Sequence, residues 1–229
     1  MRVLITNAAT SLGQALAAGL GDGHQVRLTD PEPRFGIQCD LGHGPETDAL
    51  VKDIDIVIHL AHEPRAGDGE LTWLDRNTRG TYNLLLAAAA AEVEHVILVS
   101  TLDLFAPYEK DLTVDETWKP LPSCAPAILG AHLAEFTARE FAHSHELRIT
   151  IARLGHLVRA EEVAGQPYDP MWLDERDAAQ AVAQIVQKGP AGQYSTIHIQ
   201  SAAAHARFSV ERAKSHLAFD PQYNFEANP

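Results

Sequence analysis

Polar side chains stand where several short apolar segments of the chain end, and their types suit proton transfer and the binding of hydroxyl groups. These positions are Thr6, Asp30, Asp40, Ala61-His62, Ser100-Thr101 and Gly155-His156. A carboxylate accepts hydrogen bonds from hydroxyl groups, and imidazole gains or loses a proton near neutral pH. Thr101 is therefore a candidate catalytic residue, whereas His62, Asp103 and His156 are candidates for binding a small substrate.

The elements that must position these residues alternate along the chain. Strands are predicted over residues 3–5, 25–29, 36–39, 54–60, 95–99, 148–152 and 195–199, and helices over residues 11–20, 72–91, 128–145, 177–187 and 209–218. This alternation predicts an α/β fold, a Rossmann-like doubly wound parallel sheet covered by helices on both faces. Ligands bind such a sheet beyond the carboxyl ends of its strands, so the polar residues are expected to meet at one edge.

The turn after the first strand sits where a dinucleotide-binding fold keeps its glycines. Only Gly13 is a glycine there, because Asn7 and Thr10 occupy the other two positions. Asn tolerates positive φ better than other non-glycine residues, so Asn7 is expected to keep the turn. In a loop with glycine at position 10, the backbone can approach a pyrophosphate closely. The Thr10 side chain is expected to occupy that space, and its hydroxyl is expected to donate to a phosphate oxygen.

Asp30 ends the second predicted strand at a spacing typical of the acidic residue that binds the adenosine ribose of NAD. Such a carboxylate repels a 2′-phosphate, which makes NADP the less expected cofactor. The alternative is a solvated turn aspartate before Pro31.

The bulk composition excludes several classes of protein. The 229 residues include 18 Lys and Arg against 31 Asp and Glu, and the net charge of −13 opposes binding to nucleic acid. No apolar run is long enough to cross a membrane, and two cysteines without a signal peptide favour the cytoplasm. We expect a single domain, residues 1–229, in which residues 1–156 form a dinucleotide-binding core and residues 157–229 a small C-terminal substrate-side portion.

Six segments, in order along the chain, resemble extended short-chain dehydrogenases/reductases, the sugar-nucleotide epimerase and dehydratase family. These segments are residues 40–41, 55–61, 77–88, 152–156, 172–182 and 208–221. The resemblance implies NAD(H) as cofactor, a sugar-like substrate, and a homodimer formed through the helices near residues 72–91 and 128–145. The cofactor contacts that it implies are Asn7, Thr10, Ser11, Leu12, Asp30, Asp40, Leu41, Leu60, Ala61, His62, Asn77, Ser100 and Leu154.

The chain departs from that family at the proton donor. Family members use a Ser or Thr, here matched by Thr101, together with Tyr-x-x-x-Lys on the next helix. No Tyr of this chain is followed four residues later by Lys, and the best match places Ile128 and His132 in that pair. His132 is then either a substitute acid or a helix histidine without a role.

Two other residues invite structural explanations. Arg153 is as readily explained by structural pairing as by substrate contact, and Asp177 is expected to cap a helix. No metal is expected, because His59 lies inside a predicted strand and His62 lies beyond its end.

Two hypotheses follow from these departures. The first is an NAD-dependent oxidoreductase or epimerase-like enzyme on a sugar or small polyol or acid, with non-standard acid/base groups. The second is a catalytically inactive relative that binds a dinucleotide as a sensor or scaffold.

Overall fold

The computed structural model describes residues 1–61, 69–201, 203 and 206–225, and its centre is a seven-stranded, entirely parallel sheet. The strand order is β3-β2-β1-β4-β5-β6-β9. These strands are β1 (Arg2–Ile5), β2 (Gln25–Asp30), β3 (Ile37–Gln38), β4 (Ile56–His59), β5 (His95–Thr101), β6 (Arg148–Leu154) and β9 (Tyr194–Ile199). The Rossmann-like fold class predicted from the alternating pattern is confirmed.

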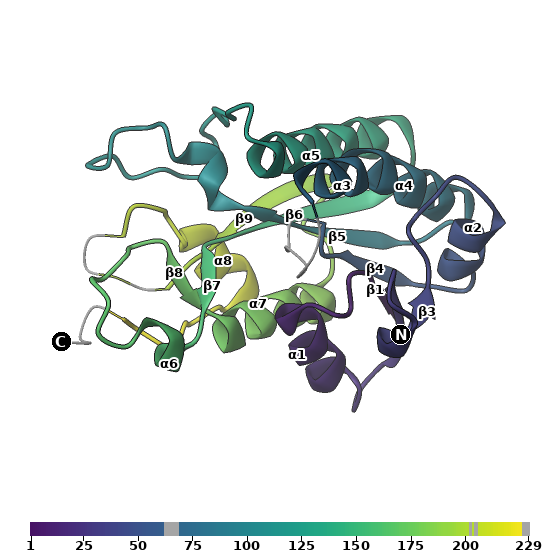
Figure 1. Cartoon of the computed structure of the whole chain (residues 1–229), viewed down its shortest axis with the longest axis horizontal. Coiled ribbons are helices and arrows are strands. Elements are labelled where there is room, and N and C mark those ends of the chain that lie inside the picture. Colours follow the sequence, from purple (N-terminus) through teal and green to yellow (C-terminus); the bar gives the residue numbers. More distant parts are fainter. Residues whose placement is uncertain (62–68, 202, 204–205, 226–229) are drawn as a thin grey trace.

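Helices cover both faces of this sheet (Figure 1). One face packs against α1 (Ser11–Leu20), α7 (Glu175–Lys188) and α8 (Glu211–Leu217), and the other against α2 (Pro45–Val51), α4 (Thr81–Ala90) and α5 (Pro126–Ser144). Central strands β4 and β5 are buried along their whole length, so both faces of each strand contribute apolar side chains to a core. No helix within the described ranges is long and apolar enough to cross a membrane.

The predicted helix over residues 72–91 is built from three pieces. It begins as α3 (Glu70–Asp75), passes through a π-helical turn, η2 (Arg76–Gly80), and continues as α4. A π turn inserts an extra residue into the helical ladder and is common at functional sites. Here it carries the buried Asn77, one of the predicted cofactor contacts.

The segments that connect the sheet hold structure that the sequence pattern did not predict. They contain α2, the turns η1 (Pro33–Phe35) and η3 (Leu102–Phe105), the short helix α6 (Ala160–Val163), and a small parallel pair of strands, β7 (His156–Val158) and β8 (Trp172–Asp174). The predicted strand over residues 36–39 is only the two-residue β3. The final helix, predicted over residues 209–218, begins two residues later, at Glu211, and ends at Leu217.

The prediction for Asp177 is wrong. Helix α7 begins at Glu175, and its N-cap is Asp174, whose side chain accepts a hydrogen bond from the Arg176 backbone. Asp177 instead accepts hydrogen bonds from the backbone N–H groups of Gln222 and Tyr223, each at 3.0 Å. It therefore holds the C-terminal segment against the helix, and burial raises the pKa of its carboxyl.

Candidate functional site

The first turn keeps the shape of a dinucleotide-binding loop without two of its glycines. Asn7 adopts φ +50°, so its expected left-handed conformation is confirmed, and its side-chain amide donates to the Leu60 carbonyl at 2.6 Å. Gly13 remains necessary, because a Cβ there would lie 2.9 Å from the Asn7 carbonyl oxygen and 3.0 Å from Ala8 Cα. Close contact between helix α1 and the turn therefore depends on this one glycine.

Thr10 acts as the N-cap of α1. Its hydroxyl donates to the Asn7 carbonyl at 2.9 Å and accepts from the Gly13 backbone N–H at 3.1 Å. The single hydroxyl proton is thus used inside the turn, and the expected donation to a phosphate finds no support. The backbone N–H groups of Ser11 and Leu12 have no partner within the described chain, and they stay available to an anion.

Asp30 lies at the carboxyl end of β2, beside this turn. It is 1 % exposed, and its carboxylate accepts from the backbone N–H groups of Ala9 at 2.9 Å and Glu32 at 2.8 Å. A small, narrow hollow is lined by Thr6, Asn7, Thr29, Asp30, Pro31, Cys39, Asp40, Leu41 and Arg76. The alternative of a solvated turn aspartate is excluded, since the side chain is buried and bonded.

Of the other predicted cofactor contacts, some line this hollow and some lie in the apolar core. Asp40 is exposed and accepts from the Gly42 N–H at 3.0 Å, while Leu41 is buried at φ +57°. Four other predicted cofactor contacts have side chains buried in the apolar core; they are Leu12, Leu60, Ala61 and Leu154. His62 lies outside the described residues.

Asn77 is fully buried against helix α5. Its amide nitrogen donates to the Trp73 carbonyl at 3.0 Å, whereas its Oδ1 has no partner within the described residues. Gly130 makes room for it, since a Cβ there would lie 3.1 Å from the Asn77 Cβ. A buried amide oxygen without a partner is costly, and a donor from a bound ligand would satisfy it.

Two buried residues, one on β5 and one on β6, are bonded to Glu135 of helix α5. Ser100 donates to Glu135 Oε1 at 2.6 Å, and Arg153 reaches both oxygens of the same carboxylate at 2.9 Å and 2.7 Å. Arg153 is therefore engaged in structural pairing, one of its two predicted explanations. Ser100, predicted to contact the cofactor, has its hydroxyl proton bonded to Glu135.

A hydrogen-bonded group of polar side chains lies next to this pair. Thr101 Oγ1 is 3.3 Å from Asp103 Oδ2, and His156 Nε2 is 2.9 Å from Asp103 Oδ1. The other ring nitrogen of His156 lies 3.9 Å from Asp169 Oδ2. The structure thus brings together three residues predicted separately, one as catalytic and two as substrate-binding. The hydrogen bond that His156 donates to Asp103 is the largest cause that raises the pKa of His156.

Arg159 is a candidate that sequence reasoning missed. Its guanidinium donates to Ser11 Oγ at 2.9 Å and to the buried Glu175 carboxylate at 2.7 Å. It therefore places a positive charge beside the free N–H groups at the start of α1. Because 148 residues separate Arg159 from Ser11, no local pattern could have indicated this contact.

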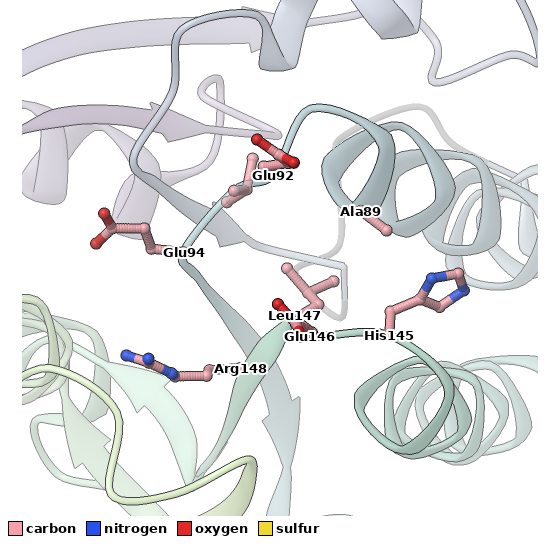
Figure 2. A pocket seen from close by; sticks show the side chains of 8 residues that line it. Ala89, Glu92, Glu94, His145, Glu146, Leu147 and Arg148 are labelled. Carbon is pink, nitrogen blue, oxygen red and sulfur yellow. The ribbon is translucent and has the colours of Figure 1, made fainter.

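Another hollow, of about 530 Å³, lies at the opposite edge of the sheet, where β5 and β6 begin. Figure 2 shows that the charged side chains of Glu92, Glu94, His145 and Arg148 do not point toward one common centre. The groups suited to chemistry are at the carboxyl ends of the strands instead, where ligands of parallel sheets bind.

Comparison with known proteins agrees with this geometry. Residues 3–170 match the NAD dependent epimerase/dehydratase family. The chain belongs to this family. A family member, the NAD-dependent glucose-6-phosphate dehydrogenase of Haloferax volcanii, is 27 % identical over 99 % of the chain and 97 % of its own length. The L-arabinose 1-dehydrogenase (NAD(P)(+)) of the same organism is 24 % identical over 97 % of each protein.

Solved structures support the same fold. Uronate dehydrogenase from Agrobacterium tumefaciens, complexed with NAD, superposes with a TM-score of 0.83 and 20 % identity, over 99 % of this chain and 86 % of that one.

The two residues matched to the family's Tyr and Lys, Ile128 and His132, both lie on α5, and Ile128 is partly buried against an apolar cluster. Ala131, one helical turn before Glu135, is 2 % exposed and packs with Leu102 just past the end of β5. His132, the next residue along α5, lines a hollow with the loop residues Pro107 and 119–123. The structure does not bring His132 together with Thr101 through any hydrogen bond within the described residues.

Proposed function

We propose that this family member is an NAD-dependent oxidoreductase that acts on a sugar or a small polyol or acid, using acid/base groups other than the family pair. The observation that carries the proposal is the first turn. Asn7 supplies the left-handed conformation, and two free N–H groups, of Ser11 and Leu12, follow it at the start of α1. These groups suit a pyrophosphate, Asp30 suits the ribose, and the unpaired Asn77 Oδ1 suits a donor from the ligand. When bound, NAD accepts a hydride from the substrate.

The substrate class is proposed from the relatives and from the polar group at the end of β5. Two of the relatives are named as dehydrogenases, one of a sugar phosphate and one of a sugar. The hydroxyl of Thr101, the carboxylate of Asp103 and the imidazole of His156 are the kinds of groups that bind sugar hydroxyls.

NAD is expected to bind and to stabilise the folded protein. At a concentration 100 times its Kd, NAD should raise the free energy of unfolding by about 2.7 kcal/mol, because it binds only the native state. NADP should bind at least about tenfold more weakly, since its 2′-phosphate meets the Asp30 carboxylate. Isothermal calorimetry and thermal melts with NAD, NADH, NADP and NADPH test this. Absence of heat and of any melting shift with all four would contradict the proposal.

Arg159→Gln is expected to weaken NAD binding by about tenfold, because a charge-assisted contact with the pyrophosphate is lost. The affinity for ADP-ribose should fall by the same factor. Adenosine, which has no phosphate, should bind the Arg159→Gln variant as tightly as it binds the wild type. Calorimetry with the three ligands measures this, with the surface variant Arg139→Gln as the matched control. An equal loss for adenosine would show that Arg159 acts only by holding α1 in place.

The second candidate is a family member that binds NAD without catalysis, and the missing Tyr-x-x-x-Lys pair favours it. NAD binding without reduction of NAD by any sugar, polyol or uronic acid would support this second candidate over the first. A cytoplasmic location and a homodimer are proposed as well. Tyr82, Leu133 and Phe136, which are large and exposed on the adjacent helices α4 and α5, offer an apolar surface for the dimer.

A further inference from the structure

Thr101, Asp103 and His156 lie at or past the ends of β5 and β6, and backbone hydrogen bonds hold them in place. Asp103 lies in η3, directly after β5, and its backbone N–H donates to Thr101 Oγ1 at 3.1 Å. The His156 N–H donates to the Met171 carbonyl at 2.7 Å. Gly155 is required before it, because a Cβ there would collide with the Gln200 side chain and the Met171 carbonyl. The imidazole of His156 is therefore presented on a fixed backbone.

The partners of the His156 ring determine which nitrogen is free for chemistry. An ionised carboxylate only accepts hydrogen bonds, so the Nε2 that lies 2.9 Å from Asp103 Oδ1 carries the hydrogen. In the neutral ring the lone pair is then on Nδ1. The side chain of His156 is 43 % exposed, so a substrate can reach it from solvent.

The charges that face His156 favour its protonated form. Asp103 approaches from η3 and Asp169 from the segment before β8, and both are carboxylates. Their charges raise the pKa of His156, while partial burial opposes the rise. A histidine held by a carboxylate in this way is the usual arrangement of a general base in enzymes, because the carboxylate orients the ring and stabilises the imidazolium.

We propose that His156, oriented by Asp103, is the proton-transfer residue of this site and does the work that a tyrosine does in related enzymes. The assignment rests on the proposed oxidoreductase function. His156 is the catalytic residue in this scheme and Asp103 is a positioning residue. Thr101, bonded to Asp103, aligns the carboxylate and presents its remaining lone pair to the substrate hydroxyl.

The proposed step is an alcohol oxidation. The substrate O–H bond would break with its proton passing to His156 Nδ1, and His156 would become imidazolium between the carboxylates of Asp103 and Asp169. Bound NAD would supply the two-electron oxidant that takes the hydride from the C–H bond of the same carbon, which leaves a carbonyl and NADH. The proton then leaves to solvent through the exposed side of the ring.

The test uses the full chain with NAD and a panel of aldoses, polyols and uronic acids. His156→Gln should lower kcat by about 10²–10⁴-fold, the usual contribution of a general base, with the Kd for NAD unchanged within about twofold. His143→Gln, on the exposed face of α5, is the matched control and should keep the wild-type rate.

The pH dependence separates proton transfer from a structural role. Oxidation needs neutral His156, so kcat should rise as pH increases through the pKa of His156. Asp103→Asn removes the charge that raises this pKa, so the kinetic break, the pH at which kcat begins to level off, should move to lower pH. The NMR titration of the His156 ring, which needs no turnover, should move by the same amount.

Three outcomes would overturn the assignment. His156→Gln could keep kcat within about threefold of the wild type, or Asp103→Asn could leave both the kinetic break and the NMR titration in place. Either result removes this inference alone, because the wild-type enzyme is then still an active oxidoreductase. A wild-type protein that binds NAD and oxidises nothing in the panel contradicts the proposed oxidoreductase and this assignment together.

Discussion

Glu135→Ala is expected to lower the free energy of unfolding by about 3–5 kcal/mol, the largest loss that we expect from a single substitution in this chain. The Glu135 carboxylate is 4 % exposed and accepts two hydrogen bonds from Arg153 and one from Ser100. Removing it leaves the Arg153 guanidinium, itself 5 % exposed, as a buried charge without its partner. The desolvation cost of Arg153 is then no longer offset.

Urea denaturation measures this loss, and two comparisons define it. The exposed pair of Arg139 and Glu140, at 3.1 Å, is the control, and Glu140→Ala should cost less than about 1 kcal/mol because solvent screens the pair. The double variant Glu135→Leu with Arg153→Met should recover most of the loss, since no buried charge remains. A Glu135→Ala protein no less stable than Glu140→Ala would contradict the argument.

The central sheet could be predicted because its strands carry their own signal. Residues 54–60 and 95–99 are rich in β-branched, apolar side chains, and β4 and β5 are buried along their full lengths. The connecting elements could not be predicted in the same way. Strand β3 has two exposed residues, and β7 and β8 have three residues each, so none is long enough to show a period.

The site could be predicted only in outline. That ligands bind past the strand ends follows from the parallel topology, which correctly grouped Thr101, Asp103 and His156 near one edge. The hydrogen-bond partner of each side chain depends on tertiary contacts. The bond from Arg159 to Ser11 joins residues far apart in the sequence, and Asp177 bonds to the C-terminal segment instead of capping its helix.

The folded protein is expected to lose about 4 kcal/mol of stability between pH 7.5 and pH 5.5 through three buried histidines. Burial lowers the pKa of His59 and His198 to about 3 and of His95 to about 4. Unfolded histidine has a pKa of about 6.5, so below that pH only the unfolded chain takes up protons. Each residue thus gives stability that is complete above about pH 6.5 and falls by about 1.4 kcal/mol per pH unit as the medium becomes more acidic.

The geometry explains why these rings stay neutral. Both nitrogens of His59 pair with hydroxyl groups, Nδ1 with Thr6 at 2.8 Å and Nε2 with Thr81 at 3.0 Å, and His198 Nε2 faces the Arg153 guanidinium at 3.4 Å. A proton on His198 Nε2 would replace an acceptor with a donor beside a cation. His156 acts in the opposite sense, since its raised pKa gives stability that is lost as pH rises, and its exposure keeps that contribution small.

Urea unfolding at pH 7.5, 6.5 and 5.5 gives the slope of the unfolding free energy against pH, which reports the number of protons taken up on unfolding. His95→Gln should reduce that slope by about one proton even if it lowers stability at every pH, because a uniform loss leaves the slope unchanged. His143→Gln, at an exposed position, should leave the slope as in the wild type. Equal slopes for His95→Gln and the wild type would mean that His95 takes up its proton in the folded state, and that its burial does not hold the ring neutral.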